Sequence, residues 1–160
     1  MTSKRKQRAF SYVLASAAPL EAENAAGIGL LFKDKDRRTV TTITQALGDS
    51  TVEEATYVAL KMVLAEARRQ RVRRFTIYLD NPLVIQQLAR EAPVPAELLA
   101  DHLQVRALLN AAGSVQVTQA MSGGNFSARI LALGVTADLH PSEHGRAPVQ
   151  LQLLADGAVA

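Results

Sequence analysis

Among the acidic side chains, Asp80 is the best placed to do chemistry. It ends the apolar run FTIYLD that begins at Phe75, and Asn81 and Pro82 follow it. The run is typical of a buried strand. An aspartate at the end of such a strand, directly before Asn81 and Pro82, is often the cap of the next helix. By themselves, the neighbouring residues favour that interpretation.

Other reactive side chains give weaker signals. The chain has no cysteine, which excludes disulfides, thiolate metal sites and a cysteine nucleophile, and which fits a reducing compartment such as the cytoplasm. His102, His140 and His144 are scattered, and Pro141 argues against one helix carrying the last two. No Ser/His/Asp grouping appears, so we expect neither a histidine metal site nor a hydrolase triad.

Basic residues fall into three groups, although the net charge is only +3. Such clusters suit the phosphates of a nucleic acid, and they equally suit solvated turns and chain ends. The tail group is Lys4, Arg5, Lys6 and Arg8, the turn group is Lys33, Lys35, Arg37 and Arg38, and the helix-end group is Arg68, Arg69, Arg71, Arg73 and Arg74.

The first third of the chain predicts three strands. Residues 10–16 and 27–32 are apolar runs, and residues 39–47 alternate between two faces. The charged KDKDRR at 33–38 is typical of a hairpin turn. Strands joined by such short links favour an antiparallel meander.

Helices and further strands follow. Ser50 or Thr51 can cap a helix with Glu53 and Glu54 in its first turn, where acids complement the helix dipole. Its dense apolar positions indicate that it lies against a sheet. The remaining predicted elements are a strand at 75–80, helices at 82–91 and 96–112, a fifth strand at 114–121 and a last helix at 126–133.

We expect one domain at residues 10–139, preceded by a basic tail at 1–9 and followed by a tail at 140–160. VQLQLL in the second tail would suit an edge strand or a docking segment. The apolar run at 10–18 is short for a signal peptide and acidic residues follow it. No stretch approaches the roughly 20 apolar residues of a membrane span, so no membrane association is expected.

Four local sequences, in order, resemble the ribonuclease H family in its reverse-transcriptase-like branch. Residues 26–29 (AGIG) resemble the start of its second strand, and 55–60 (ATYVAL) its Ala-Glu-Tyr-x-Ala-Leu helix motif. Residues 75–87 resemble its strand ending in Asp-Ser before a helix, and 125–129 (NFSAR) its Asn-x-x-Ala-Asp motif. The resemblance covers roughly 10–134. It implies an α/β fold with a five-stranded mixed sheet, strands one to three antiparallel and strands four and five parallel to strand one, flanked by helices.

The resemblance also implies where catalytic acids would lie. In that family four carboxylates hold two Mg²⁺ ions that hydrolyse a phosphodiester. The first acid corresponds to Leu14 or Ala15, depending on register, the second to Thr56 and the last to Arg129, so that Asp80 alone is retained. An arginine at a metal position opposes a divalent cation. We therefore expect no metal cofactor, no hydrolysis and an Arg129–Asp80 ion pair.

Two other acids are possible replacements for the missing ones. Glu53 lies one helical turn before Thr56 and would lean toward the same site. Asp138 would serve as the last acid if the final helix had another register, but residues 125–128 fix that register without a gap. Neither restores the first acid.

Three functions follow, in decreasing order of preference. The first is an inactive ribonuclease H-like domain that binds the backbone of a duplex or RNA/DNA hybrid through Arg68, Arg69, Arg71, Arg73, Arg74, Lys4, Arg5 and Lys6. With 4% aromatic residues, few rings are available for base stacking. The second is a scaffold for protein interaction or self-association, through residues 149–154 or the helix at 96–112. The third is residual ribonuclease activity using Asp80 and Glu53.

Overall fold

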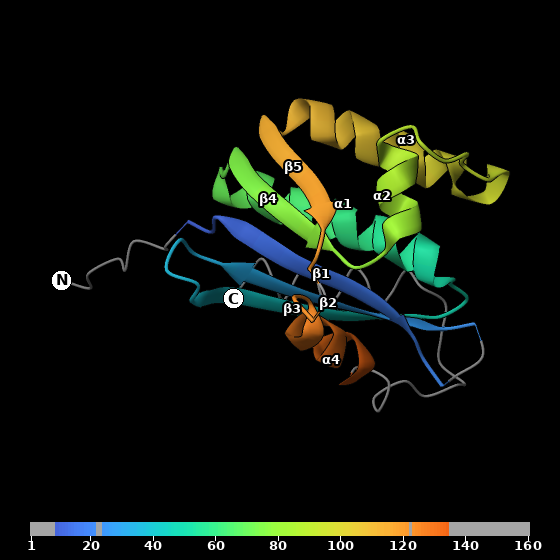
Figure 1. The fold of residues 1–160 in the computed structure, drawn as a ribbon, viewed down its shortest axis with the longest axis horizontal. Helices are drawn as coiled ribbons and strands as arrows, with labels where there is room; N and C mark the ends of the chain where they lie inside the picture. Colours follow the sequence, from blue (N-terminus) through green and yellow to red (C-terminus); the bar gives the residue numbers. More distant parts are fainter. Residues whose placement is uncertain (1–8, 22–23, 122, 135–160) are drawn as a thin grey trace.

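The protein is described by a computed structural model in which residues 9–21, 24–121 and 123–134 are placed. Five strands form one mixed sheet in the order β3-β2-β1-β4-β5. β2 is antiparallel to β1 and β3, whereas β4 and β5 run parallel to β1. This is the predicted fold class, which is confirmed (Figure 1). The strands are β1 Tyr12–Pro19, β2 Ala26–Lys33, β3 Thr39–Leu47, β4 Arg74–Leu79 and β5 Ser114–Gln119, and the helices are α1 Val52–Gln70, α2 Pro82–Leu88, α3 Ala96–Ala111 and α4 Phe126–Gly134.

Several strand and helix boundaries differ from the predicted ones. β1 starts two residues later than predicted and continues to Pro19. The cap of α1 is Thr51, whose hydroxyl accepts a hydrogen bond from the backbone N–H of Glu54 at 3.1 Å. The α2 helix ends at Leu88, short of the predicted Glu91, and Arg90 then adopts the left-handed conformation with φ 62°. A residue in that conformation commonly ends a helix.

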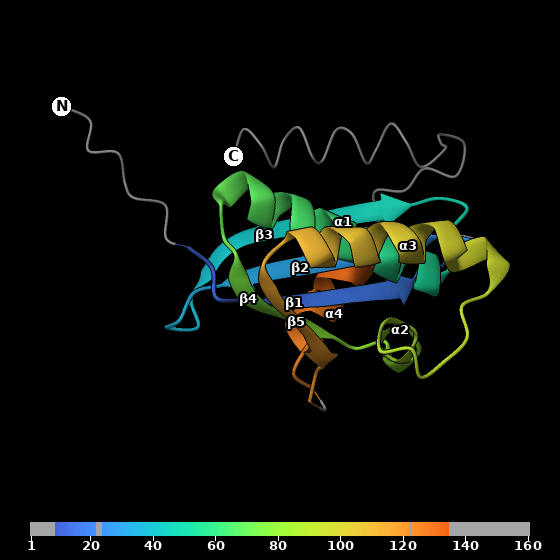
Figure 2. The same cartoon turned by 90° about the horizontal axis from the view of Figure 1, so that it is seen from above.

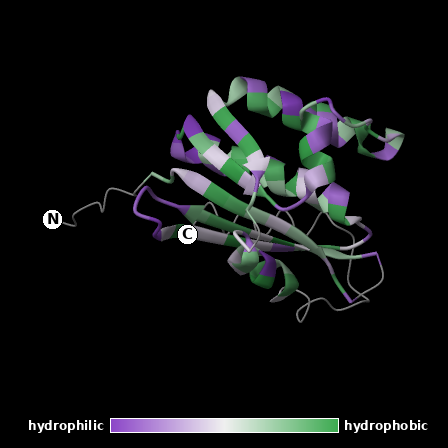
Figure 3. Ribbon diagram, viewed as in Figure 1, coloured by the Kyte–Doolittle hydropathy of each residue, from purple (hydrophilic) through white to green (hydrophobic). Residues whose placement is uncertain are grey.

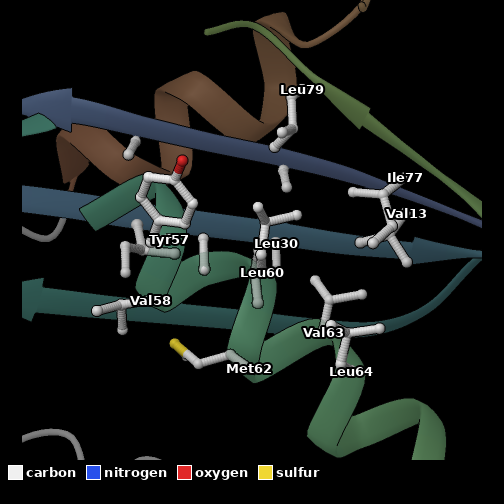
Figure 4. Packing of buried hydrophobic residues seen from close by; sticks show 14 of the residues in the cluster. Val13, Leu30, Tyr57, Val58, Leu60, Met62, Val63, Leu64, Ile77 and Leu79 are labelled. Carbon is white, nitrogen blue, oxygen red and sulfur yellow. The ribbon is translucent and has the colours of Figure 1, made fainter. Parts of the chain in front are cut away.

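Helices α1 and α3 lie on one face of the sheet and α4 lies on the other (Figures 1 and 2). The first face is filled by large side chains of α1, such as Tyr57, Leu60 and Val63, which pack against Val13 and Leu30 of the strands (Figure 4). This confirms the prediction that the first helix lies against a sheet. No helix in the described part of the chain is long and apolar enough to span a bilayer.

On the other face α4 packs directly against the backbone of β2. A Cβ atom on Gly27 would come within 2.0 Å of the carbonyl oxygen of Ala132, and one on Gly29 within 2.1 Å of that of Ala128. Any side chain at these positions would push the helix away. The two glycines therefore allow close packing of the backbones, and this contact fixes the position of α4 on the sheet.

Candidate functional site

Asp80 follows β4 directly, at the end of the sheet where the parallel strands β1, β4 and β5 finish. Ala15 is paired with Leu79, so the next residues of the two strands, Ser16 and Asp80, are neighbours. The Ser16 hydroxyl donates to Asp80 Oδ2 at 2.7 Å. A hydrogen bond to an ionised carboxylate is stronger than one between neutral groups. The serine hydroxyl is therefore the polar group that β1 presents to Asp80.

Leu14 and Ala15, the positions predicted for the first acid, are not the residues of β1 that meet Asp80. Leu14 is half-buried opposite Tyr78, and Ala15 is buried in the core on the α1 side. Ser16 takes that place, and the sequence analysis missed it. The available signal was that Ser16 is the one polar residue between Val13 and Leu20. The exact register of two strands 64 residues apart cannot be read from either strand alone.

Asp80 is not the cap of α2. Asn81 caps that helix, since its side-chain oxygen accepts from the backbone N–H of Val84 at 3.1 Å. The helix-cap interpretation of Asp80 is therefore wrong, and its carboxylate is directed to Ser16.

A pocket of about 360 Å³ opens beside Asp80. Its charged lining residues come from three elements: Glu53 from the first turn of α1, Asp80 after β4 and Arg129 from α4. The other lining residues are Ala17, Pro19, Val52, Asn81, Pro82 and Leu83. Two carboxylates and one guanidinium thus share a hollow at the carboxyl end of the parallel strands, where α/β folds commonly bind ligands.

Thr56 is not part of this lining. It is buried, and its hydroxyl donates to the carbonyl oxygen of Val52 in the preceding turn at 2.7 Å. Because that hydroxyl donates its only proton within the helix, it offers no donor to the pocket. The charged side chain that α1 contributes to the pocket is Glu53, which is one of the two replacement acids named from the sequence. The other, Asp138, lies outside the described residues.

Arg129 lines the pocket but forms no ion pair with Asp80 in the described part of the chain. The predicted pair is therefore wrong. Arg129 is solvent-exposed on α4, and Asp80 already accepts a hydrogen bond from Ser16 on β1. An exposed pair across an open pocket gains little over two solvated charges.

Asn125 joins the start of α4 to the strands that end at the pocket. Its Nδ2 donates to the carbonyl oxygens of Ala15 and Tyr78, each at 2.8 Å. The side chain is buried, and its Oδ1 accepts no hydrogen bond from the described residues. One amide thus ties β1, β4 and α4 together across 110 residues of sequence. The sequence analysis included Asn125 in a motif but gave it no role.

A buried polar network holds α2 against α1 and α3. The Tyr57 hydroxyl donates to Gln87 Oε1 at 2.7 Å and lies 3.1 Å from His102 Nδ1. Since the hydroxyl has one proton, His102 Nδ1 must carry a proton and donate to Tyr57. Burial, and secondarily the charge of Asp101, raises the pKa of Tyr57 to about 12. Burial, and then the charges of Arg106 and Arg90, lower the pKa of His102. His102 is therefore a neutral structural residue; His140 and His144 lie outside the described residues.

The basic groups lie at the other end of the sheet. The β2–β3 turn and the end of α1 both lie at the end of the sheet where β4 starts, and Figure 3 shows hydrophilic residues in both segments. Residues 33–38 and 66–74 carry nine Lys and Arg side chains against the carboxylates of Asp34, Asp36 and Glu66. The tail cations Lys4, Arg5 and Lys6 lie outside the described residues.

Arg69 differs from the other arginines of its group. Its Nε donates to Glu66 Oε2 at 3.0 Å. Burial alone would raise the pKa of Glu66, but hydrogen bonds from Arg69 and Gln70 and the arginine charge together lower it. Arg68, Arg71, Arg73 and Arg74 are exposed, and no ion pair within the described residues engages them.

Known structures share this fold. Ribonuclease H1 from Halobacterium salinarum has a TM-score of 0.70 at 22% identity, with 79% of this chain and 96% of that chain covered. The N-terminal ribonuclease H domain of a Mycobacterium tuberculosis protein has a TM-score of 0.69 at 23% identity, covering 80% and 95%. LC11-RNase H1, solved with an RNA/DNA hybrid, has a TM-score of 0.67 at 16% identity, covering 76% and 92%.

A search of curated proteins gives no significant match. The family model described as reverse transcriptase-like matches residues 15–134, which is most of the chain and includes every element that builds the Asp80 pocket. Three observations point to the same family: the order of the strands, the position of Asp80 at the end of β4, and the match to this model. The chain belongs to the reverse-transcriptase-like family and has the ribonuclease H fold.

Proposed function

We propose that this chain is a ribonuclease H-like domain that binds nucleic acid without cleaving it. The observation that carries the loss of cleavage is the lining of the Asp80 pocket. Asp80 and Glu53 are its two carboxylates, and Arg129 faces the same space. Phosphodiester hydrolysis by this fold needs two divalent ions held by several carboxylates.

The residues present do not fit such a metal pair. Ser16 and Thr56 supply neutral hydroxyls, of which one is committed to Asp80 and the other to the carbonyl oxygen of Val52. Among the described residues, no group of three or more His, Cys, Asp or Glu is placed to hold a metal ion. A guanidinium at the pocket adds repulsion for any cation that enters.

Binding is supported by the charge at the opposite end of the sheet. Arg68, Arg71, Arg73 and Arg74 present exposed guanidiniums that are suited to phosphate. One protein of the same fold has been solved with an RNA/DNA hybrid. Contacts to the backbone alone predict weak sequence preference and strong dependence on salt.

The test titrates a labelled RNA/DNA hybrid at low and moderate salt and then adds Mg²⁺ or Mn²⁺, with the native protein and with Asp80→Asn. We expect binding that weakens steeply with salt, and intact RNA with both proteins. Cleavage by the native protein that Asp80→Asn abolishes would overturn the loss of activity. Absence of binding at both salt concentrations would overturn the nucleic-acid function.

Self-association is the second candidate, and the outer side of α4 favours it. Phe126, Ile130 and Leu133 recur at helical spacing and are 66%, 52% and 42% exposed, and Met121 precedes them at 84%. The predicted surface on α3 is also present, since Leu99 and Leu103 are exposed. The segment 149–154 lies outside the described residues. Sedimentation velocity over a wide concentration range tests this candidate, and a strict monomer would exclude it.

A further inference from the structure

A second pocket lies at the end of the sheet opposite Asp80. It has a volume of about 510 Å³ and opens between the carboxyl ends of α1 and α3, which lie side by side over the same face of the sheet (Figures 1 and 2). Its apolar lining residues are Leu64, Ala67, Val72, Leu108, Ala111 and Ala112. Three arginines, Arg68, Arg71 and Arg73, complete the lining.

Two backbone features shape this pocket. Arg71 ends α1 in the left-handed conformation with φ 58°, and its N–H is directed to the carbonyl oxygens of Ala67 and Arg68. Gly113 ends α3 with φ 102°, a conformation that favours glycine, and Ser114 then donates its N–H to the carbonyl oxygen of Arg73 at 2.8 Å. The segments that follow the two helices therefore lie side by side where β4 and β5 begin.

The arginines are not explained by their helix alone. A cation in the last turn of a helix complements the negative end of the helix dipole, which accounts for Arg68 and Arg69. Arg71 and Arg73 lie beyond that turn. The nearby carboxylate of Glu66 is hydrogen-bonded to Arg69 and Gln70. Three guanidiniums thus line one apolar hollow with no acidic partner in the described part of the chain.

We propose that this pocket binds one nucleotide unit of a single-stranded nucleic acid. The phosphate is held by Arg68, Arg71 and Arg73, and the base lies on the apolar lining residues with the plane of a guanidinium against it. The volume is in the range of small-ligand sites and is large enough for a base and its sugar. Charge complementarity favours this ligand over a neutral one.

The proposal rests on the proposed nucleic-acid function but places the contact far from Asp80. β4 has six residues and separates the two pockets, a distance of about 20 Å for an extended strand. The phosphate of a nucleotide bound in this second pocket therefore does not reach the Asp80 pocket.

The experiment measures binding of a labelled 12-nucleotide single strand by fluorescence anisotropy across a range of salt, using the full chain. Arg73→Glu reverses a charge in the pocket, and Lys35→Glu makes the same change in the exposed β2–β3 turn at the same end of the molecule. Ala111→Phe fills the pocket without changing charge, at an exposed helix position. Circular dichroism confirms that each variant is folded.

Arg73→Glu is expected to weaken binding at least about tenfold and to lower the salt slope by about 0.7, the value for one single-strand phosphate. Ala111→Phe is expected to weaken binding several-fold with the native salt slope. Lys35→Glu is expected to weaken binding less, because it changes only the overall charge at this end of the molecule. Equal losses for Arg73→Glu and Lys35→Glu, with native binding by Ala111→Phe, would overturn the pocket while leaving the nucleic-acid function intact.

Two further results separate the alternatives. If polyglutamate displaces the oligonucleotide at equal charge concentration, the pocket accepts acidic polypeptide and the nucleotide proposal fails. If neither the single strand nor an RNA/DNA hybrid binds at low salt, the nucleic-acid function itself fails. Binding of the hybrid but not of the single strand overturns only the pocket.

Discussion

The two ends of the parallel strands are built in opposite ways. At the carboxyl end, charges of both signs share a small pocket, and the surrounding backbone is locked by Asn125 and by the glycines under α4. At the amino end nine Lys and Arg side chains outnumber three carboxylates, and the arginines lie at a helix end and in a turn. The rigid end of the fold and its strongly charged end therefore lie at opposite ends of the parallel strands.

The largest effect on stability is expected at the close contact between β2 and α4. Gly29→Ala places a Cβ 2.1 Å from the carbonyl oxygen of Ala128, so α4 must move. We expect a loss of about 3 kcal/mol in the free energy of unfolding, a cost typical of overpacking. Urea denaturation measures it. The matched control is Gly134→Ala, where no described atom lies within 4 Å of the added Cβ. If both variants are equally stable, α4 is not locked to β2 as described.

Asn125→Ala should cost about 2 kcal/mol, because two backbone carbonyl groups lose their common donor in a buried position. Thermal and urea unfolding report the loss. Asn110→Ala, which removes the same amide from an exposed position of α3, should change stability by less than about 0.5 kcal/mol. Similar values for the two variants would show that the carboxyl end does not depend on Asn125.

The network behind the Asp80 pocket gives a smaller, pH-dependent effect. The pKa of His102 is lowered in the folded protein, first by burial and then by Arg106 and Arg90. The unfolded chain therefore binds more protons than the folded one as the pH falls below the ordinary value of 6.5. The contribution of His102 to the free energy of unfolding is therefore present above pH 6.5. It is lost as the pH falls below that value, with a slope of at most about 1.4 kcal/mol per pH unit.

His102→Gln is expected to remove that component, since glutamine does not titrate. The measurement is the free energy of unfolding from pH 7.5 to 5.0 for both proteins. Parallel curves would mean that His102 is not the residue responsible.

The addition of Mg²⁺ is expected to have the smallest effect on stability. Millimolar Mg²⁺ should leave the melting temperature unchanged, because a ligand stabilises a protein only when its concentration is comparable to or exceeds its dissociation constant. Calorimetry with Mg²⁺ and with an equal ionic strength of Na⁺ makes the comparison. A rise seen only with Mg²⁺ and absent in Asp80→Asn would show that the carboxyl end still holds a cation.

The sequence was sufficient for most of the fold. Hydrophobic periodicity predicted the five strands and the helices between them, because burial of one face dictates that periodicity. The position of Asp80 at the end of β4 was predicted on the same basis. The end of α2 was predicted too late because the turn at Arg90 carries no proline or glycine as a signal.

The partners of Asp80 were harder to predict. Ser16 was missed since its position depends on the pairing of β1 with β4, which neither segment specifies locally. The Arg129–Asp80 pair was predicted from family positions alone, and no ion pair joins these two described residues. Asn125 contacts backbone rather than side chains, so its partners cannot be inferred from residue types.

The bond from Asn125 to Ala15 also has a consequence for folding during synthesis. It joins β1 with the start of the last described helix, a separation of 110 residues that gives the contact a high contact order. Until α4 has left the ribosome, the β1–β2 surface that includes Gly27 and Gly29 has no helix over it. The nascent chain therefore exposes a glycine-containing sheet face until α4 packs on it, and an exposed sheet surface of this kind is prone to aggregation.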